Sequence, residues 1–366
     1  MKYLYLLLLS SLLLVSCKST GEDLLIYNVD ISQKAVLNDY VHDYSFVRLE
    51  TRKDCLLGTP QKIEVTDSMI SLLDHDKIFF FDRSGKFISK VDRIGKGGDE
   101  YISITDFTLQ DTLAYVLVRA QKTIYVYDLN GNLNKKISLK VWYAHLRFCG
   151  KDTLVLSSEN ANESGKNFLV YDVLTDSVIA EYDDFKNNEN LLFDTFSPFA
   201  GYDHGLLLIH PFDYSVYRLG VDGMDEFCKF KFKTKESSDF IQKGGSFNEL
   251  MEKSANKNVV KYLGSLCRAN DNMYLTFDLF DTVGGVGTHL CKIDPKGKIT
   301  NVRLFEKFDK KFPYLTAPIV FYNGTLVSFA SASWILHVEK EHKLTKFHQM
   351  GLTKEDNYIV FFHNLW

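Results

Sequence analysis

Short apolar runs separated by polar turns recur along most of the chain, and this pattern predicts a protein built from β-strands. The repeated unit is an apolar run, a tight turn that contains Asp and usually Gly, and a second run. Such a unit is typical of a β-hairpin, because Asp and Gly suit the backbone of a tight turn. Six copies can be recognised, at Lys77–Ile88, Thr123–Leu133, Asn167–Ile179, Tyr214–Gly223, His289–Ile299 and, in degenerate form, Trp334–Leu344.

The spacing of these turns indicates how the hairpins are grouped. The successive intervals are 46, 44, 50, 72 and 45 residues between the turn acids Asp82, Asp128, Asp172, Asp222, Asp294 and Glu339. A period of ~40–50 residues matches the four-stranded blade of a β-propeller. Two further apolar runs precede most hairpins, such as Asp106–Leu109 and Asp111–Val118, and would supply the other two strands. We therefore expect a six-bladed β-propeller of four-stranded antiparallel blades. Closing the ring needs strands from the termini, for which Tyr44–Glu50 and Tyr358–His363 are the candidates, and which terminus closes the ring stays open.

The 72-residue interval predicts an inserted helix between blades four and five. Ser246 and Glu249 have the spacing of a helix capping box, and apolar residues from Phe247 to Leu263 recur at helical spacing. The insertion would occupy 234–263. Two roles remain open for it: packing on one rim of the ring, or covering the channel mouth as a lid.

The N-terminus indicates export. A charged start is followed by an apolar run, Leu4–Val15, that is too short to span a bilayer and is typical of a signal peptide. The run ends in Leu14-Val15-Ser16-Cys17, which resembles the lipobox of bacterial lipoproteins, in which the Cys is lipidated and becomes the mature N-terminus. The alternative is an ordinary secretory signal. We expect a signal peptide at 1–16, a lipid-anchored tether and start of the domain at 17–40, and the propeller at 41–366, held at the outer membrane on its periplasmic or external side.

Composition narrows the choice of function. The chain has 43 basic and 47 acidic residues, a balance that argues against nucleic-acid binding. Beyond Cys17, five cysteines remain, none with CxxC or metal-ligand spacing, so we expect small buried residues. There is no Walker, HExxH, GxSxG or EF-hand motif. We expect a monomer whose contact with the membrane is through its lipid anchor.

One glycine-rich stretch supports a family resemblance. After the first hairpin the chain reads Gly95-Lys-Gly97-Gly98-Asp99-Glu100-Tyr101. This resembles the Gly-x-Gly-Pro-Gly-Glu-Tyr signature of the six-bladed β-propeller lipoproteins of the Bacteroidetes, relatives of the NHL-repeat propellers. Gly98 stands where that family has Pro, and Asp99 where it has Gly. The resemblance implies the same fold and a place in the cell envelope, whereas function must be argued from a site.

Propeller topology predicts where a ligand would bind. One face is built from the loops between the second and third strands and the loops between blades, and ligands usually occupy the channel mouth on that face. Pockets that combine aromatic side chains with a few polar groups are the usual binding sites. The candidate ring consists of His75, Tyr101, Arg119, Trp142, His145, Glu159, His210, Tyr214, Asp278 and Trp334. We expect a non-catalytic binding module, without a cofactor, for a small molecule, glycan, peptide or protein partner.

Two alternatives remain open. Six-bladed relatives include calcium-dependent lactonases and a zinc-dependent lyase that acts on peptide C-termini. The resemblance therefore admits a metal-dependent enzyme holding Ca or Zn, and His75, His145 and His210 fall on the predicted face, where neutral imidazoles could bind zinc. The other alternative is a purely structural part of an envelope complex.

Overall fold

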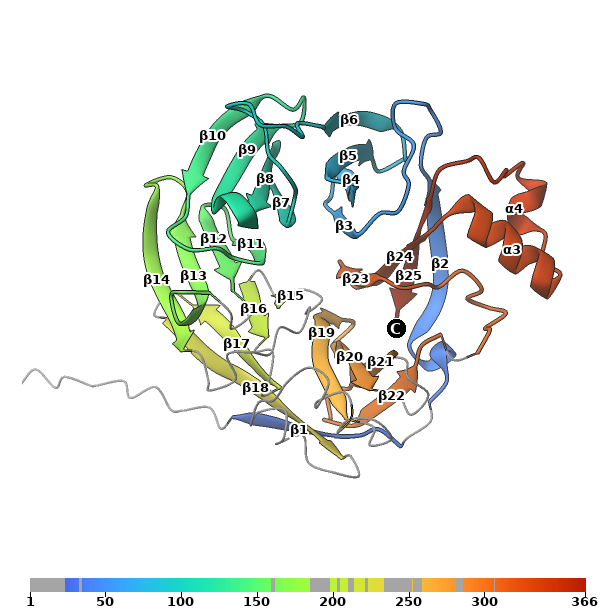
Figure 1. The fold of residues 1–366 in the computed structure, drawn as a ribbon. Helices are drawn as coiled ribbons and strands as arrows, with labels where there is room; N and C mark the ends of the chain where they lie inside the picture. Colours follow the sequence, from blue (N-terminus) through green and yellow to red (C-terminus); the bar gives the residue numbers. More distant parts are fainter. Residues whose placement is uncertain are drawn as a thin grey trace, which may run out of the picture.

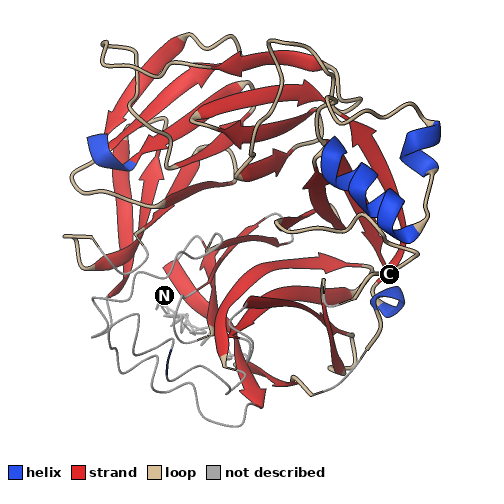
Figure 2. Cartoon of the chain, turned by 45° about the vertical axis from the view of Figure 1, so that its right-hand side comes forward, coloured by secondary structure: helices blue, strands red, loops and turns tan. Residues whose placement is uncertain are grey.

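The computed structural model of the chain is a closed ring of six β-sheets (Figure 1). It describes residues 24–32, 35–158, 162–184, 198–202, 205–209, 214–220, 223–233, 252, 259–280, 286–305 and 307–366. Six four-stranded antiparallel blades form the ring, as the turn spacing predicts. Figure 2 shows that strands make up most of the ring and that the longer helix lies at its edge.

Blades one to three follow one another along the chain with the innermost strand first. Blade one contains β3 (Lys62–Val65), β4 (Met69–Asp74), β5 (Lys77–Asp82) and β6 (Phe87–Val91). Blade two contains β7 (Asp106–Gln110), β8 (Leu113–Val118), β9 (Thr123–Asp128) and β10 (Leu133–Ser138). Blade three contains β11 (His145–Cys149), β12 (Thr153–Ser157), β13 (Lys166–Asp172) and β14 (Ser177–Asp184). A 3₁₀ turn, η2 (Arg119–Gln121), joins β8 to β9.

Blades four to six complete the ring. Blade four contains β15 (Phe199–Tyr202), β16 (Gly205–Ile209), β17 (Ser215–Gly220) and β18 (Gly223–Lys233). Blade five contains β19 (Val260–Ala269), β20 (Asn272–Phe280), β21 (Val286–Ile293) and β22 (Ile299–Arg303). Blade six contains β23 (Ile319–Tyr322), β24 (Thr325–Ala330), β25 (Ile359–Leu365) and β2 (Val41–Arg48).

Segments from opposite ends of the sequence close the ring. In blade six, β25 lies between β24 and β2, and β2 runs antiparallel to it with Val41 opposite Leu365 and Arg48 opposite Ile359. Both candidate segments therefore take part in closing the ring. Before β2, the strand β1 (Leu25–Asp30) adds to the outer edge of blade four, parallel to β18, and the chain then passes η1 (Leu37–Asp39).

The turns of the hairpins follow the predicted chemistry. In the first blade the Asp82 carboxylate accepts hydrogen bonds from the backbone amides of Ser84 (2.8 Å) and Lys86 (3.0 Å). Gly85 has φ +89°, a left-handed conformation that suits glycine far better than other residues. The Asp side chain thus provides hydrogen-bond acceptors for the backbone amides of the turn, and Gly adopts the backbone conformation that reverses the chain.

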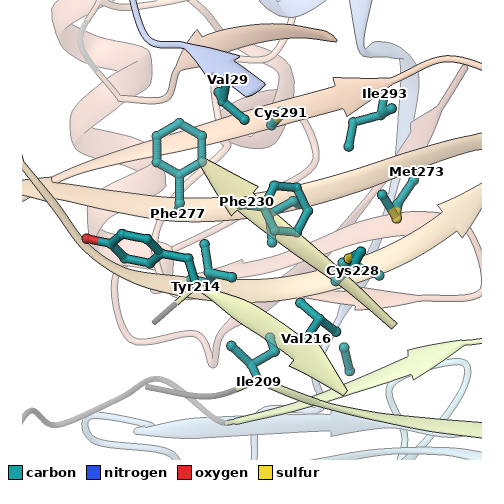
Figure 3. Close-up of a cluster of buried hydrophobic side chains, with 14 of the residues drawn as sticks. Val29, Ile209, Tyr214, Val216, Cys228, Phe230, Met273, Phe277, Cys291 and Ile293 are labelled. Carbon is teal, nitrogen blue, oxygen red and sulfur yellow. The ribbon is translucent and has the colours of Figure 1, made fainter. Parts of the chain in front are cut away.

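The hydrophobic core lies in the layers between neighbouring blades. Figure 3 shows the layer between blades four and five, where Tyr214 and Phe230 face Phe277 and Cys291. The second and third strands are covered on both faces, which explains why β4 and β5 are almost continuously apolar. The five cysteines described, Cys55, Cys149, Cys228, Cys267 and Cys291, are free thiols, and all but Cys149 are buried. Burial raises the pKa of the Cys228 thiol to about 12, consistent with an inert packing role.

The predicted sixth hairpin is wrong. Most of Trp334–Leu344 lies in a helix, α3 (Ala332–His342), which is followed by the short α4 (Lys346–Gln349) in the loop between β24 and β25. The Ser331 hydroxyl caps α3 by accepting a hydrogen bond from the Trp334 amide (3.2 Å). The buried positions Ala332, Ile335, Val338 and Glu339 follow helical spacing, so the period distinguishes this segment from the hairpins.

The predicted insertion 234–263 lies almost wholly outside the described residues, but its C-terminal end is not helical. Residues from Val260 onward form β19. Register shifts between Val260 and Tyr262, and between Leu263 and Leu266, interrupt the pairing of β19 with β20. These bulges place the buried residues Val260, Leu263 and Leu266 three apart, which imitates a helical period in the sequence.

Candidate functional site

The innermost strands of blades one, two and three carry polar side chains at their first and third positions. These positions are Lys62 and Glu64 in β3, Asp106 and Thr108 in β7, and His145 and Arg147 in β11. Each innermost strand follows directly from an inter-blade loop, so the first positions lie at the face where a propeller ligand is expected. By contrast, β23 of blade six reads Ile-Val-Phe-Tyr.

The first positions form a charged layer across three blades. The Lys62 ammonium lies 2.6 Å from Asp106 Oδ1 and donates to the Phe107 carbonyl (2.6 Å). His145 Nδ1 lies 3.5 Å from Asp106 Oδ2, which also accepts a hydrogen bond from the Leu146 amide (3.0 Å). Burial alone would raise the pKa of the Asp106 carboxyl, but the Lys62 charge and the His145 hydrogen bond outweigh it and lower that pKa to about 2. Asp106 therefore stays ionised and joins its blade to both neighbours.

A second charged layer follows one register step deeper. Glu64 Oε1 accepts hydrogen bonds from the Thr108 hydroxyl and the Leu109 amide, both at 3.1 Å. Glu64 Oε2 is buried without a hydrogen-bond partner among the residues that the structure describes, and it lies 3.4 Å from Nη1 of Arg147, whose side chain is 42% exposed. Of these six polar positions, only His145 belongs to the candidate ring predicted from the sequence. Their shared register in otherwise apolar innermost strands was the signal that would have identified the rest.

A cavity of about 430 Å³ opens on the loop face over blades two and three. It is lined by Ser103, Thr105, Arg119, Ala120, Lys122 and Trp142. These residues come from three loops: the one entering β7, the one between β8 and β9, and the one entering β11. The lining residue Thr105 directly precedes Asp106, and Trp142 lies three residues before His145, so the charged first layer continues from the cavity wall.

Arg119 and Trp142 form the main contact in this cavity. The guanidinium carbon of Arg119 lies 3.5 Å from the centroid of the Trp142 ring, a cation–π contact. The Arg119 amide donates to the Thr105 hydroxyl (2.9 Å), which fixes the start of η2. Lys122 ends η2 with φ +48°, an uncommon conformation for a residue with a side chain. The loop is thus held in a defined shape that presents Arg119.

Two other members of the candidate ring cannot line the mouth, because they are buried. The Tyr101 hydroxyl donates to the Asp76 carbonyl (2.8 Å), and burial raises its pKa above the usual value. The Tyr214 hydroxyl donates to the Val260 carbonyl (2.6 Å) inside the layer between blades four and five. Both side chains lie away from the mouth, and each fastens a loop to a neighbouring backbone.

The glycine-rich stretch before Tyr101 is an inter-blade turn. Glu100 Oε2 accepts a hydrogen bond from the Gly97 amide (2.7 Å). A Cβ atom at Gly95 would overlap the same carboxylate. Gly95, Gly97 and Glu100 of the signature therefore stabilise this turn.

The remaining candidates are dispersed. His75 is 65% exposed, with Nδ1 2.7 Å from Asp74 Oδ1, and Asp278 is half-buried on β20. Trp334, 37% exposed, lines a second cavity of about 370 Å³ between blades five and six, together with Phe305, Phe308 and His342. Glu159, His210 and Cys17 lie outside the described residues. The structure therefore brings Arg119 and Trp142 together, with His145 close by in sequence and linked to Asp106.

Comparison with known proteins gives the family. A family model described as a domain of unknown function, DUF4934, matches residues 25–364. The chain belongs to the DUF4934 family. No curated protein matches it significantly.

Two solved structures have a fold similar to that of this DUF4934 protein. A Bacteroides fragilis protein named as exported superposes with a TM-score of 0.71 at 17% identity, over 93% of this chain and 99% of that one. A member of the DUF4221 family from Bacteroides vulgatus gives a TM-score of 0.53 at 9% identity, over 88% and 98%. At these identities the likeness concerns the fold alone.

Two further observations concern cofactors and membranes. The part of the DUF4934 chain that the structure describes contains no group of three or more His, Cys, Asp or Glu side chains that could hold a metal ion. Among the described helices, none has the length and apolar character needed to cross a bilayer.

Proposed function

We propose that this DUF4934 protein is a cell-envelope binding module that takes its ligand at the loop face over blades two and three. The observation that carries the proposal is the cavity in which Arg119 stacks on Trp142. A cation held against an aromatic ring, beside the hydroxyls of Ser103 and Thr105, offers both directional hydrogen bonds and a flat apolar surface. The module acts without a chemical step of its own.

The surroundings of the cavity support a binding role. Ion pairs of Asp106 and Glu64 join the innermost strands of three blades next to the cavity, which supports a preformed site. A preformed site loses less conformational entropy on binding than a flexible one does. Likeness to an exported protein and the lipobox at Cys17 support a location in the envelope, where such a module would capture ligands outside the cytoplasm.

A ligand screen by thermal shift tests the proposal. A ligand present at ~100 times its Kd should add about 2.7 kcal/mol to the free energy of unfolding. We expect Arg119→Ala and Trp142→Ala to abolish the shift. Trp334→Ala is the matched control, since it removes an exposed indole from the other cavity. A ligand whose shift survives both cavity variants but disappears in Trp334→Ala would place binding elsewhere and overturn the proposal.

A further inference from the structure

The cavity over blades two and three presents positive charge that the protein leaves unused. Among the described residues, Arg119 forms no ion pair, and its contact is with the uncharged Trp142 ring. Lys122 lies 3.4 Å from the Glu163 carboxylate, and that pair is exposed on the rim. An exposed pair of this kind is weak and readily exchanged for another partner.

The carboxylates below the cavity are already neutralised. Asp106 is paired with Lys62, and Glu64 lies beside Arg147, which is itself partly exposed. Neither carboxylate is available to balance Arg119, because both are buried. A chain whose net charge is −4 thus places a locally positive wall at this mouth. Such a wall attracts anions and repels cationic ligands.

The remaining lining distinguishes between kinds of anion. Apart from Trp142, the lining contains no apolar side chain larger than that of Ala120, so an apolar peptide side chain would find no pocket to anchor it. Ser103 and Thr105 instead provide hydroxyls, which pair well with a ligand that is itself rich in hydroxyl groups. Because the guanidinium is planar and lies against the indole, its N–H groups can meet a carboxylate in a two-pronged hydrogen bond.

We infer that the ligand of this site is an acidic saccharide, whose carboxylate or sulfate group binds Arg119 while its hydroxyls bind Ser103, Thr105 and Lys122. The inference rests on the proposed function and adds the class of ligand. Arg119 is the residue that determines specificity for the acid, and Trp142 holds it in place.

Isothermal titration of the full mature protein tests the class of ligand with four probes. They are an oligogalacturonate, its methyl ester, a sulfated chondroitin oligosaccharide and an oligo-glutamate peptide. We expect the acid oligosaccharide to bind at least tenfold more tightly than its uncharged ester, and its affinity to fall as salt is raised. Arg119→Gln should weaken the acid about 10- to 100-fold while leaving the ester unchanged, because a charged hydrogen bond contributes about 1.5–3 kcal/mol. The two acidic sugars separate carboxylate from sulfate recognition.

The outcomes separate the ligand class from the function. If the acid and the ester bind equally and Trp142→Ala weakens both, the site binds a ligand but the acidic class is wrong. If the peptide binds more tightly than both acidic sugars, the saccharide class is wrong. If neither acidic sugar binds, the saccharide class is also wrong. If Arg119→Gln and Trp142→Ala leave the affinity of every bound probe unchanged, both the ligand class and the proposed function are wrong. Trp334→Ala again serves as the control.

Discussion

His363 should make the stability of the ring depend on pH. Its imidazole is buried in β25, opposite Tyr44 of β2 and Leu326 of β24. Nδ1 has no hydrogen-bond partner in the described part of the chain, and Nε2 lies 3.4 Å from the Ser328 hydroxyl. Desolvation lowers the pKa of His363 from its ordinary value of 6.5 to about 4. The folded protein therefore resists protonation of a group that the unfolded chain protonates readily.

The direction and size of the effect follow from this difference. Above pH 6.5 the imidazole is neutral in both states, and its contribution to stability is fully present. As the pH falls from 6.5 towards 4, the unfolded chain binds a proton that the folded chain does not, and stability is lost. The shift corresponds to about 3 kcal/mol of the free energy of unfolding. At roughly 2 °C per kcal/mol for a domain of this size, the Tm should fall by about 6 °C.

Urea unfolding across this pH range measures the effect. His363→Gln is less stable than the wild type at neutral pH but cannot titrate, so the gap between the two proteins should narrow as the pH falls. His337→Gln removes an exposed imidazole from α3 and should leave the pH dependence unchanged. Carboxylates titrate in all three proteins, so the comparison isolates His363. A gap that stays constant between pH 6.5 and 4 would refute the reasoning.

Three other predictions concern separate parts of the molecule. Cys17→Ser should abolish membrane association, measured by fractionation after a salt wash; continued partition with membranes would contradict lipidation. Glu339→Gln should cost about 2–4 kcal/mol in urea unfolding, because the buried carboxylate accepts hydrogen bonds from the Tyr314 hydroxyl (2.8 Å) and the Phe347 amide (2.7 Å), whereas the exposed Glu341→Gln should be neutral. Asp106→Asn should cost about 3–5 kcal/mol by removing the carboxylate nearest to the Lys62 ammonium, and Asp106→Asn with Lys62→Met should recover part of it; equal costs for the single and double variants would argue against coupling between blades.

The fold was largely predictable because its signals are local. Each Asp and Gly turn marks a hairpin through its own backbone requirements, and the repeat spacing then implies the ring. The prediction for Trp334–Leu344 is wrong because the repeat spacing favours a sixth hairpin there, although Ser331 and the spacing of Ile335 and Val338 indicate a helix. Where two bulges mimic a helical period in β19, only pairing with β20 identifies the strand.

The candidate site was predictable only in part, because exposure depends on the neighbouring blade. Tyr101 and Arg119 both lie in loops of the same face, yet one is buried and the other lines a cavity. Loop position alone cannot separate them, since burial of Tyr101 depends on contacts with Tyr125 and Tyr127. The two charged layers, which extend from Lys62 to Arg147, are hard to predict because they form only when three strands far apart in sequence become neighbours.

The insertion of β25 between β24 and β2 sets an order of events during synthesis. Val41 is made early but finds its partner, Leu365, only when the last strand has been delivered. Until then, β24 and β2 each present an unpaired edge, and such edges invite aggregation or cleavage by proteases. Contacts between residues so distant in sequence also form slowly. A chain of this design therefore reaches its finished fold only after its last strand has been made, and a prematurely ended copy keeps two open strand edges.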